Sequence, residues 1–157
     1  MNARHGIWRR CLWPAAAVVL AAGGLALFVS RSESLPQGPR PVVWDKTSCA
    51  ECRMAVSEPG YAAQLQLADG TVLDFDDVGC LFMYLDATAP QVHAVYIHHV
   101  REERWVAQEK VGFVAAGPSP MDYGLGAVDR ATEGGLPFEE ARERVLAASR
   151  TAGHAHD

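Results

Sequence analysis

The chain has 157 residues, 49% of them apolar, so it is long enough for one modest domain with a real core. Its formal net charge is −5, but basic residues near the start hide a more acidic main part. From Arg40 onward there are ten basic and eighteen acidic residues, a net charge of −8. Such acidity argues against nucleic acid as a partner, because nucleic acids bind clustered lysine and arginine.

Residues 1–10 form a basic head, and residues 11–29 form an uncharged apolar run. At about 1.5 Å per residue a helix of this length spans roughly 28 Å, close to the hydrocarbon core of a bilayer. Positive charge at its start predicts a cytoplasmic head, a single-pass anchor in the inner membrane and a main domain in the periplasm. A cleaved signal peptide is the alternative, but the apolar run continues past the small residues at 21–23 that would suit cleavage.

Export would place the domain in an oxidising compartment, where disulfides form and persist. Three cysteines follow the apolar run, namely Cys49, Cys52 and Cys80. Because the number is odd, at least one of these thiols is unpaired or is held by something other than a disulfide. The count therefore favours metal or redox chemistry.

Residues 30–43 contain three prolines and one glycine, a composition that predicts a semi-stiff linker. The main domain is expected over residues 44–150 and a disordered tail over residues 151–157. Within the domain, residues 62–76 alternate between apolar and polar types on both sides of Asp69-Gly70, which predicts a β-hairpin. A three-residue loop with a left-handed glycine pairs Leu65 with Leu73 and Ala63 with Phe75.

Asp76 or Asp77 can cap a short helix that runs to about residue 86. Strands are expected over residues 92–100, 105–106 and 111–115. A glycine-rich loop is expected through residues 124–135, and a final amphipathic helix over 137–149. This order predicts an α+β fold of small strand–strand–helix–strand units, with room for two of them.

Two thiols and a thioether lie within six residues in the motif Cys49-Ala-Glu-Cys52-Arg-Met54. The spacing suits a turn that runs into an extended segment, so that the three sulfurs converge. Copper(I) accepts two or three such soft ligands, whereas zinc usually takes four. A structural Cys49–Cys52 disulfide with Met54 in the core, and a thiol–disulfide redox pair, are the alternatives. Arg53 stands where a c-type haem attachment motif requires histidine, which excludes that motif.

Five further positions could contribute to a site. Met121 follows a proline in a loop and is a candidate thioether ligand, although packing under the loop would also explain it. Cys80 and Met83 lie one helical turn apart and are expected to be a buried thiol and a core methionine. His98 and His99 are adjacent on a strand and face opposite ways, so we expect surface or hydrogen-bonded histidines.

The chain resembles the NosL family, the copper(I)-binding accessory proteins of nitrous oxide reductase in denitrification. The likeness covers roughly residues 44–130 and is carried by five short motifs: Cys49-Ala-Glu-Cys52-Arg-Met54, Asp69-Gly70, Phe75-Asp76-Asp77, Trp105-Val106 and Pro120-Met121. It implies an extracytoplasmic copper chaperone with an α+β fold and no enzymatic activity.

By this resemblance Cys49, Cys52 and Met54 form the copper-site motif, and Met121 is the matching Pro-Met position. The implied partners are a copper donor and a periplasmic enzyme that receives copper, either nitrous oxide reductase or another copper enzyme. The chain departs from the family at Arg53, where glycine is frequent, and in its expected membrane helix, where many members carry a lipid anchor.

Overall fold

The computed structural model describes residue 23 and residues 35–153, with the side chains of the last two left out. The expected basic head, and the expected membrane anchor apart from Gly23, lie outside the described residues. Among the helices that are described, none is both long and apolar enough to cross a bilayer. Residues 35–153 belong to one compact unit, which contains Cys49, Cys52 and Cys80.

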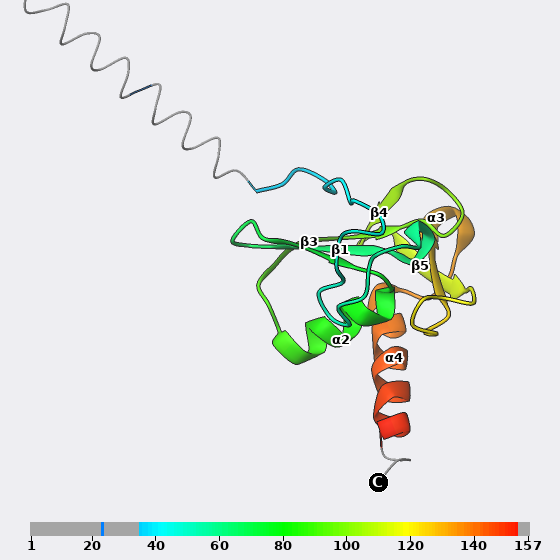
Figure 1. The fold of residues 1–157 in the computed structure, drawn as a ribbon. Coiled ribbons are helices and arrows are strands. Elements are labelled where there is room, and N and C mark those ends of the chain that lie inside the picture. The colour runs from blue at the N-terminus through cyan, green and yellow to red at the C-terminus, as the bar shows by residue number, and fades with distance from the viewer. Residues whose placement is uncertain (1–22, 24–34, 154–157) are drawn as a thin grey trace, which may run out of the picture. The chain divides into compact units, whose positions relative to one another are not determined.

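An antiparallel sheet of four strands forms the centre of this unit, with spatial order β2-β1-β3-β4 (Figure 1). The strands are β1 (Ala63–Leu67), β2 (Val72–Phe75), β3 (Val92–His98) and β4 (Trp105–Ala107), and a short 3-10 turn, η1 (Pro59–Tyr61), precedes them. The predicted hairpin register is confirmed, because Ala63 pairs with Phe75 and Leu65 with Leu73. Gly70 adopts the left-handed conformation that this register requires, with φ of 87°.

Helix α2 (Val78–Thr88) follows β2 directly and begins where the sequence predicted. The Asp77 side chain is its N-cap and accepts a hydrogen bond from the Gly79 N–H at 2.9 Å. The helix runs two residues beyond the predicted end and stops at Ala89, which takes a left-handed conformation. The segment β1-β2-α2-β3 is therefore one strand–strand–helix–strand unit, as predicted.

The second half of the domain pairs β5 (Val111–Ala115) with β6 (Leu125–Asp129), followed by α3 (Arg130–Glu133) and α4 (Phe138–Gly153). The prediction of a loop over residues 124–135 was wrong, because β6 and α3 lie there. A Cβ on Gly126 would come within 2.7 Å of Ala116 and Val100, so this glycine marks close packing within a strand. No strand follows α4 within residues 35–153, so the second half does not form a complete strand–strand–helix–strand unit, for which the sequence left room.

Three phenylalanines join the two halves. Phe82 on α2 contacts Phe113 on β5 and Phe138 at the start of α4, with ring centroids 5.7 and 5.1 Å apart. Helices α2 and α4 pack against each other, as Figure 1 shows. The apolar core thus fixes the orientation of α2, and with it the position of the helix N-terminus.

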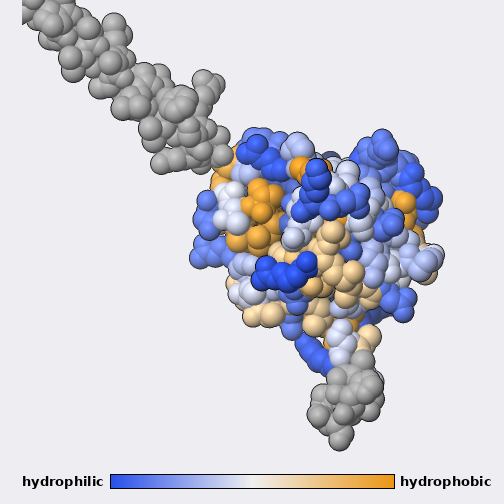
Figure 2. All heavy atoms as spheres, viewed as in Figure 1, coloured by the Kyte–Doolittle hydropathy of each residue, from blue (hydrophilic) through white to orange (hydrophobic). Residues whose placement is uncertain are grey.

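Part of the expected linker belongs to the folded unit. Residues 36–40 lie along β1, where Gln64 and Gln66 are fully buried beneath them. The Gln64 side chain bonds both the N–H and the carbonyl of Arg40, and the Gln66 amide donates to the Gly38 carbonyl at 2.8 Å. In the view of Figure 2, the surface shows small hydrophobic patches between hydrophilic residues.

Replacing Asp77 with alanine should lower the free energy of unfolding by about 1–3 kcal/mol, because two backbone N–H groups lose their acceptor. These donors are the N–H groups of Gly79 and Met121. Urea unfolding followed by circular dichroism measures the effect. Asp86→Ala is the control, because the Asp86 carboxylate is exposed and its ion pairs, at 3.8 Å, are long and weak. This substitution should change the free energy of unfolding by less than about 0.5 kcal/mol. Equal losses in both variants would contradict the role given to Asp77.

Candidate metal site

The cysteine motif forms a closed turn, as its spacing predicted. The Cys49 N–H donates to the Met54 carbonyl at 2.8 Å, and the Arg53 N–H donates to the Cys49 carbonyl at 3.2 Å. Ser48 and Ala55 form a β-bridge on either side of the turn. The chain therefore makes a narrow loop with Cys49, Cys52 and Met54 near its tip.

Arg53 holds a left-handed backbone conformation, with φ of 67°. Residues with a Cβ adopt this conformation at a cost, and glycine adopts it freely. The backbone at this position has a conformation that favours glycine. The exposed Arg53 side chain beside the motif therefore comes with some backbone strain.

Hydrogen bonds hold the turn against the end of β2 and the start of α2. The Ala50 N–H donates to the Asp74 carbonyl at 2.9 Å. The buried Asp76 carboxylate accepts from the Ser57 N–H, also at 2.9 Å. These contacts bring the cysteine turn to the N-terminus of α2.

This placement gathers three thiols. The sulfurs of Cys49, Cys52 and Cys80 all lie within 4.8 Å of one another. All three are free thiols in the structure. Cys49 and Cys80 are 0% and 2% exposed, whereas Cys52 is half-buried and forms the more open side of the cluster.

Sequence reasoning treated Cys80 as an ordinary buried thiol. It is buried as expected, but it points into the cluster from the first turn of α2. Two signals in the sequence could have found it: the odd number of cysteines after the apolar run, and its position three residues after a capping aspartate. The cap brings the helix start, and hence the thiol, next to whatever precedes the helix.

The cluster holds one of its thiols in the ionised form. The Cys80 thiol donates a hydrogen bond to the Cys49 sulfur, as do the backbone N–H groups of Asp76, Cys52 and Glu51. Together these bonds outweigh burial and lower the pKa of Cys49 to about 5. The same Cys49 contact, with burial, raises the pKa of Cys80.

The pKa of Cys52 is raised mainly because the side chain is removed from water, although a hydrogen bond from the Met54 N–H opposes that rise. Cys49 is therefore the thiolate of the group at neutral pH. One negative charge and two thiols make a site that attracts a soft cation.

Met54 is 53% exposed, one of the most exposed large apolar side chains in residues 35–153. It therefore does not fill a gap in the core, which the structural disulfide alternative assumed. The side chain is therefore largely open to solvent, two residues after the half-buried Cys52.

Met121 is half-buried in the loop between β5 and β6 and packs against the core. Its N–H donates to the Asp77 carboxylate at 3.3 Å. Asp77 and Cys80 are three residues apart and share a helix face, so the Met121 loop lies beside the helix end that carries Cys80. The expected packing role is present, and the loop lies close to the cysteine-bearing end of α2.

His98 and His99 are both buried, so the expectation of surface histidines was wrong and that of hydrogen-bonded ones was right. The His98 ring lies between Trp44 and Trp105, with centroids 6.2 and 5.2 Å away. The pKa of His98 is lowered because burial disfavours its charged form.

A second group of potential ligands consists of His99, Glu102 and Glu133. His99 Nε2 lies 2.8 Å from Glu133, and Arg101 and Arg104 pair with the two carboxylates. Because cations already neutralise these carboxylates, the group is a structural network.

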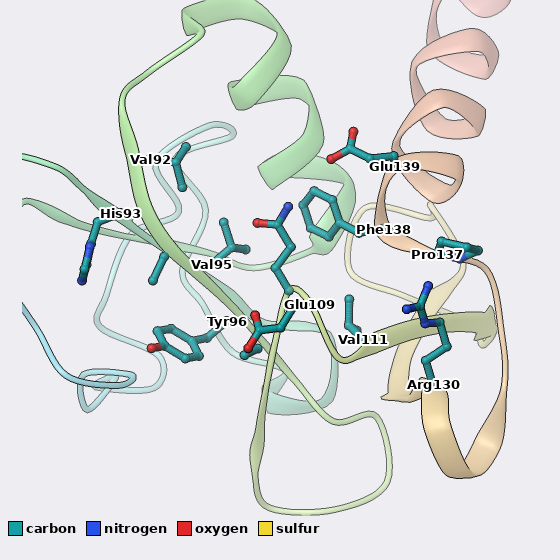
Figure 3. Close-up of a pocket in the computed structure, with 13 residues that line it drawn as sticks. Val92, His93, Val95, Tyr96, Glu109, Val111, Arg130, Pro137, Phe138 and Glu139 are labelled. Carbon is teal, nitrogen blue, oxygen red and sulfur yellow. The ribbon is translucent and has the colours of Figure 1, made fainter.

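A pocket of about 510 Å³ lies between β3 and the start of α4. Figure 3 shows the Glu109 carboxylate, the Arg130 guanidinium and the Phe138 ring around it. No cysteine or methionine lines this pocket. The sulfur cluster is therefore a separate site.

Comparison with known proteins supports the fold. No protein-family model matches the sequence, and no curated protein does. The structure matches the crystal structure of the copper chaperone NosL from Shewanella denitrificans, with a TM-score of 0.55 and 22% identity. The match covers 67% of this chain and 96% of that one, so the domain has the fold of that chaperone.

Thiolate absorbance in the ultraviolet should report the charge on the cluster directly. In reduced, metal-free protein, one thiolate should form as the pH rises through about 5. In Cys80→Ala the midpoint should move upward, since the largest contribution to the low pKa is lost. In Cys80→Ser it should stay low, because the hydroxyl can replace the thiol as a donor. Identical titrations in the two variants would show that the Cys80 donor does not set the pKa of Cys49.

Proposed function

We propose that this chain is a NosL-type copper chaperone, a carrier of copper(I) without catalytic activity. The observation that carries the proposal is the group of three sulfurs within 4.8 Å, of which Cys52 alone is partly open to solvent. The shared fold with a copper chaperone and the motifs of the sequence support it.

The donor set fits copper(I) better than other biological cations. Thiolate and thioether sulfurs select copper(I), while calcium and magnesium require oxygen ligands. With metal–thiolate bonds of about 2.3 Å, three sulfurs in a plane around one ion lie roughly 4 Å apart. The cluster therefore needs little movement to take up such an ion. Zinc usually requires a fourth protein ligand in a structural site, and neither a histidine nor a carboxylate belongs to this cluster.

The openness of the site favours transport over permanent storage. A carrier must let a partner's ligand reach the metal, and here Cys52 is half-buried and Met54 is 53% exposed. Met121, whose loop is hydrogen-bonded to the Asp77 cap of α2, is the fourth residue that we include. We assign Cys49, Cys52, Met54 and Met121 to copper binding and transfer.

The cellular setting follows from the N-terminal sequence. The basic head and the apolar run would anchor the chain in the inner membrane, with the copper site in the periplasm. There it would accept copper from a donor and pass it to a copper enzyme, with nitrous oxide reductase as the proposed client. The net charge of −8 from Arg40 onward would steer the domain toward a basic patch on its partner.

Thiol–disulfide exchange through Cys49 and Cys52 is the second candidate. The low pKa of Cys49 favours it, because the thiolate is the reactive form. Its accessible partner would be Cys52. In a disulfide exchange protein Met54→Ala would leave activity unchanged, whereas in a copper carrier it would alter copper handling.

Copper(I) titration against a chromophoric chelator under anaerobic, reducing conditions tests the proposal. The wild type should bind copper(I), and a Cys49→Ser, Cys52→Ser, Met54→Ala variant should lose at least about a hundredfold in affinity, since two thiolate ligands and the exposed thioether are gone. Met83→Leu is the matched control, because Met83 lies on α2, is not one of the proposed ligands, and the swap conserves volume. Unchanged affinity in the triple variant would refute the site, and rapid oxidation of a substrate dithiol would favour the second candidate.

A further inference from the structure

We propose that Cys80 is a copper ligand and completes a three-thiolate site with Cys49 and Cys52, and that Met54 is the exchange ligand through which copper(I) arrives and leaves. The inference rests on the proposed function. It assigns the three cysteine sulfurs to binding the ion and the exposed thioether of Met54 to transferring it.

The geometry separates Cys80 from Met54. The Cys80 sulfur lies within 4.8 Å of both motif cysteine sulfurs, and the side chain is 2% exposed. Met54 is 53% exposed and lies on the outside of the turn. An ion among the three cysteine sulfurs is thus shielded on the side of Cys49 and Cys80, and can be approached on the side of Cys52 and Met54.

The elements that carry the buried sulfurs hold them in place. Cys80 follows the capped start of α2, and its neighbours Leu81 and Phe82 are fully buried in the core. Cys49 is fixed by the hydrogen bond between its N–H and the Met54 carbonyl. Because these two sulfurs come from separate, well-anchored elements, they are arranged before the metal arrives, which lowers the entropic cost of binding. The exposed thioether of Met54 is free to turn toward a partner or toward the ion.

Transfer then proceeds by stepwise ligand exchange, with copper in the +1 state throughout. Loading forms the bonds between copper and the sulfurs of Cys49, Cys52 and Cys80, and the thiols of Cys52 and Cys80 each release a proton to water. During release, Met54 and then a partner sulfur bond copper from the exposed side and displace Cys52, before the bonds to Cys49 and Cys80 break. Cys52 and Cys80 then each take a proton from water, and no electron is transferred at any step.

X-ray absorption at the copper edge tests the ligand set with the methionine variants and with Cys80→Ser. In copper(I)-loaded wild type we expect three sulfur neighbours, and the same three in Met54→Ala and in Met54→Ala/Met121→Ala. Cys80→Ser should show two sulfurs and an affinity lower by at least about tenfold. Loss of a sulfur in Met54→Ala would overturn the inference, because the third ligand would then be the thioether.

The rate of copper(I) transfer to an excess of competing chelator tests the role of Met54. Met54→Ala should slow the transfer by about fivefold or more while changing the equilibrium affinity by less than about threefold. A normal transfer rate, or a loss of affinity as large as that of Cys80→Ser, would overturn the role of Met54.

Circular dichroism checks that Cys80→Ser is folded. If it is not, the number of sulfur neighbours in the methionine variants still decides whether the third ligand is a thioether. Failure of the wild type to bind copper(I) would refute the proposed function itself, whereas binding through two cysteines and Met54 would refute only the part given to Cys80.

Discussion

Two adjacent buried carboxylates hold the functional end of this domain together. Asp76 accepts a hydrogen bond from the Ser57 N–H and so ties down the strand that returns from the cysteine turn. Asp77 caps α2 and also accepts from the N–H of Met121. Three segments that are far apart in the sequence therefore meet at one helix N-terminus, and each of them brings sulfur. A buried carboxylate must have hydrogen-bond donors, so the requirement that stabilises the fold also assembles the site.

The electrostatics of the cluster follow from this arrangement. A helix N-terminus carries partial positive charge, and the start of α2 lies beside the Cys49 thiolate. Backbone N–H groups and the Cys80 thiol point at the same sulfur, which lowers its pKa to about 5. The site therefore exists as one thiolate and two thiols before a metal is bound. A copper ion among the three sulfurs would replace the proton that Cys80 shares with Cys49.

Much of the fold could be predicted because local rules agree with the final structure. The alternation around Asp69-Gly70 fixed the register of β1 and β2, and the aspartate pair marked the start of α2. Gly126 misled the prediction, since its role depends on Val100 and Ala116, which approach it only in the folded state. Cys49, Cys52 and Met54 were visible as a motif, but Cys80 was not, because its partners lie about thirty residues away and proximity across that gap is a tertiary property. The left-handed backbone at Arg53 could not be predicted either, because glycine, the usual signal for this conformation, is absent from the position.

Copper(I) binding among the sulfurs of Cys49, Cys52 and Cys80 is the proposal on which the others depend. Anomalous diffraction at the copper edge, from crystals of the copper(I)-loaded protein grown under anaerobic conditions, locates the ion without assuming its ligands. We expect one copper peak within bonding distance of those three sulfurs, with the Met54 side chain at its solvent side. A copper peak at the His99 and Glu133 group, or one bound by methionines with Cys80 still a free thiol, would contradict a three-thiolate site.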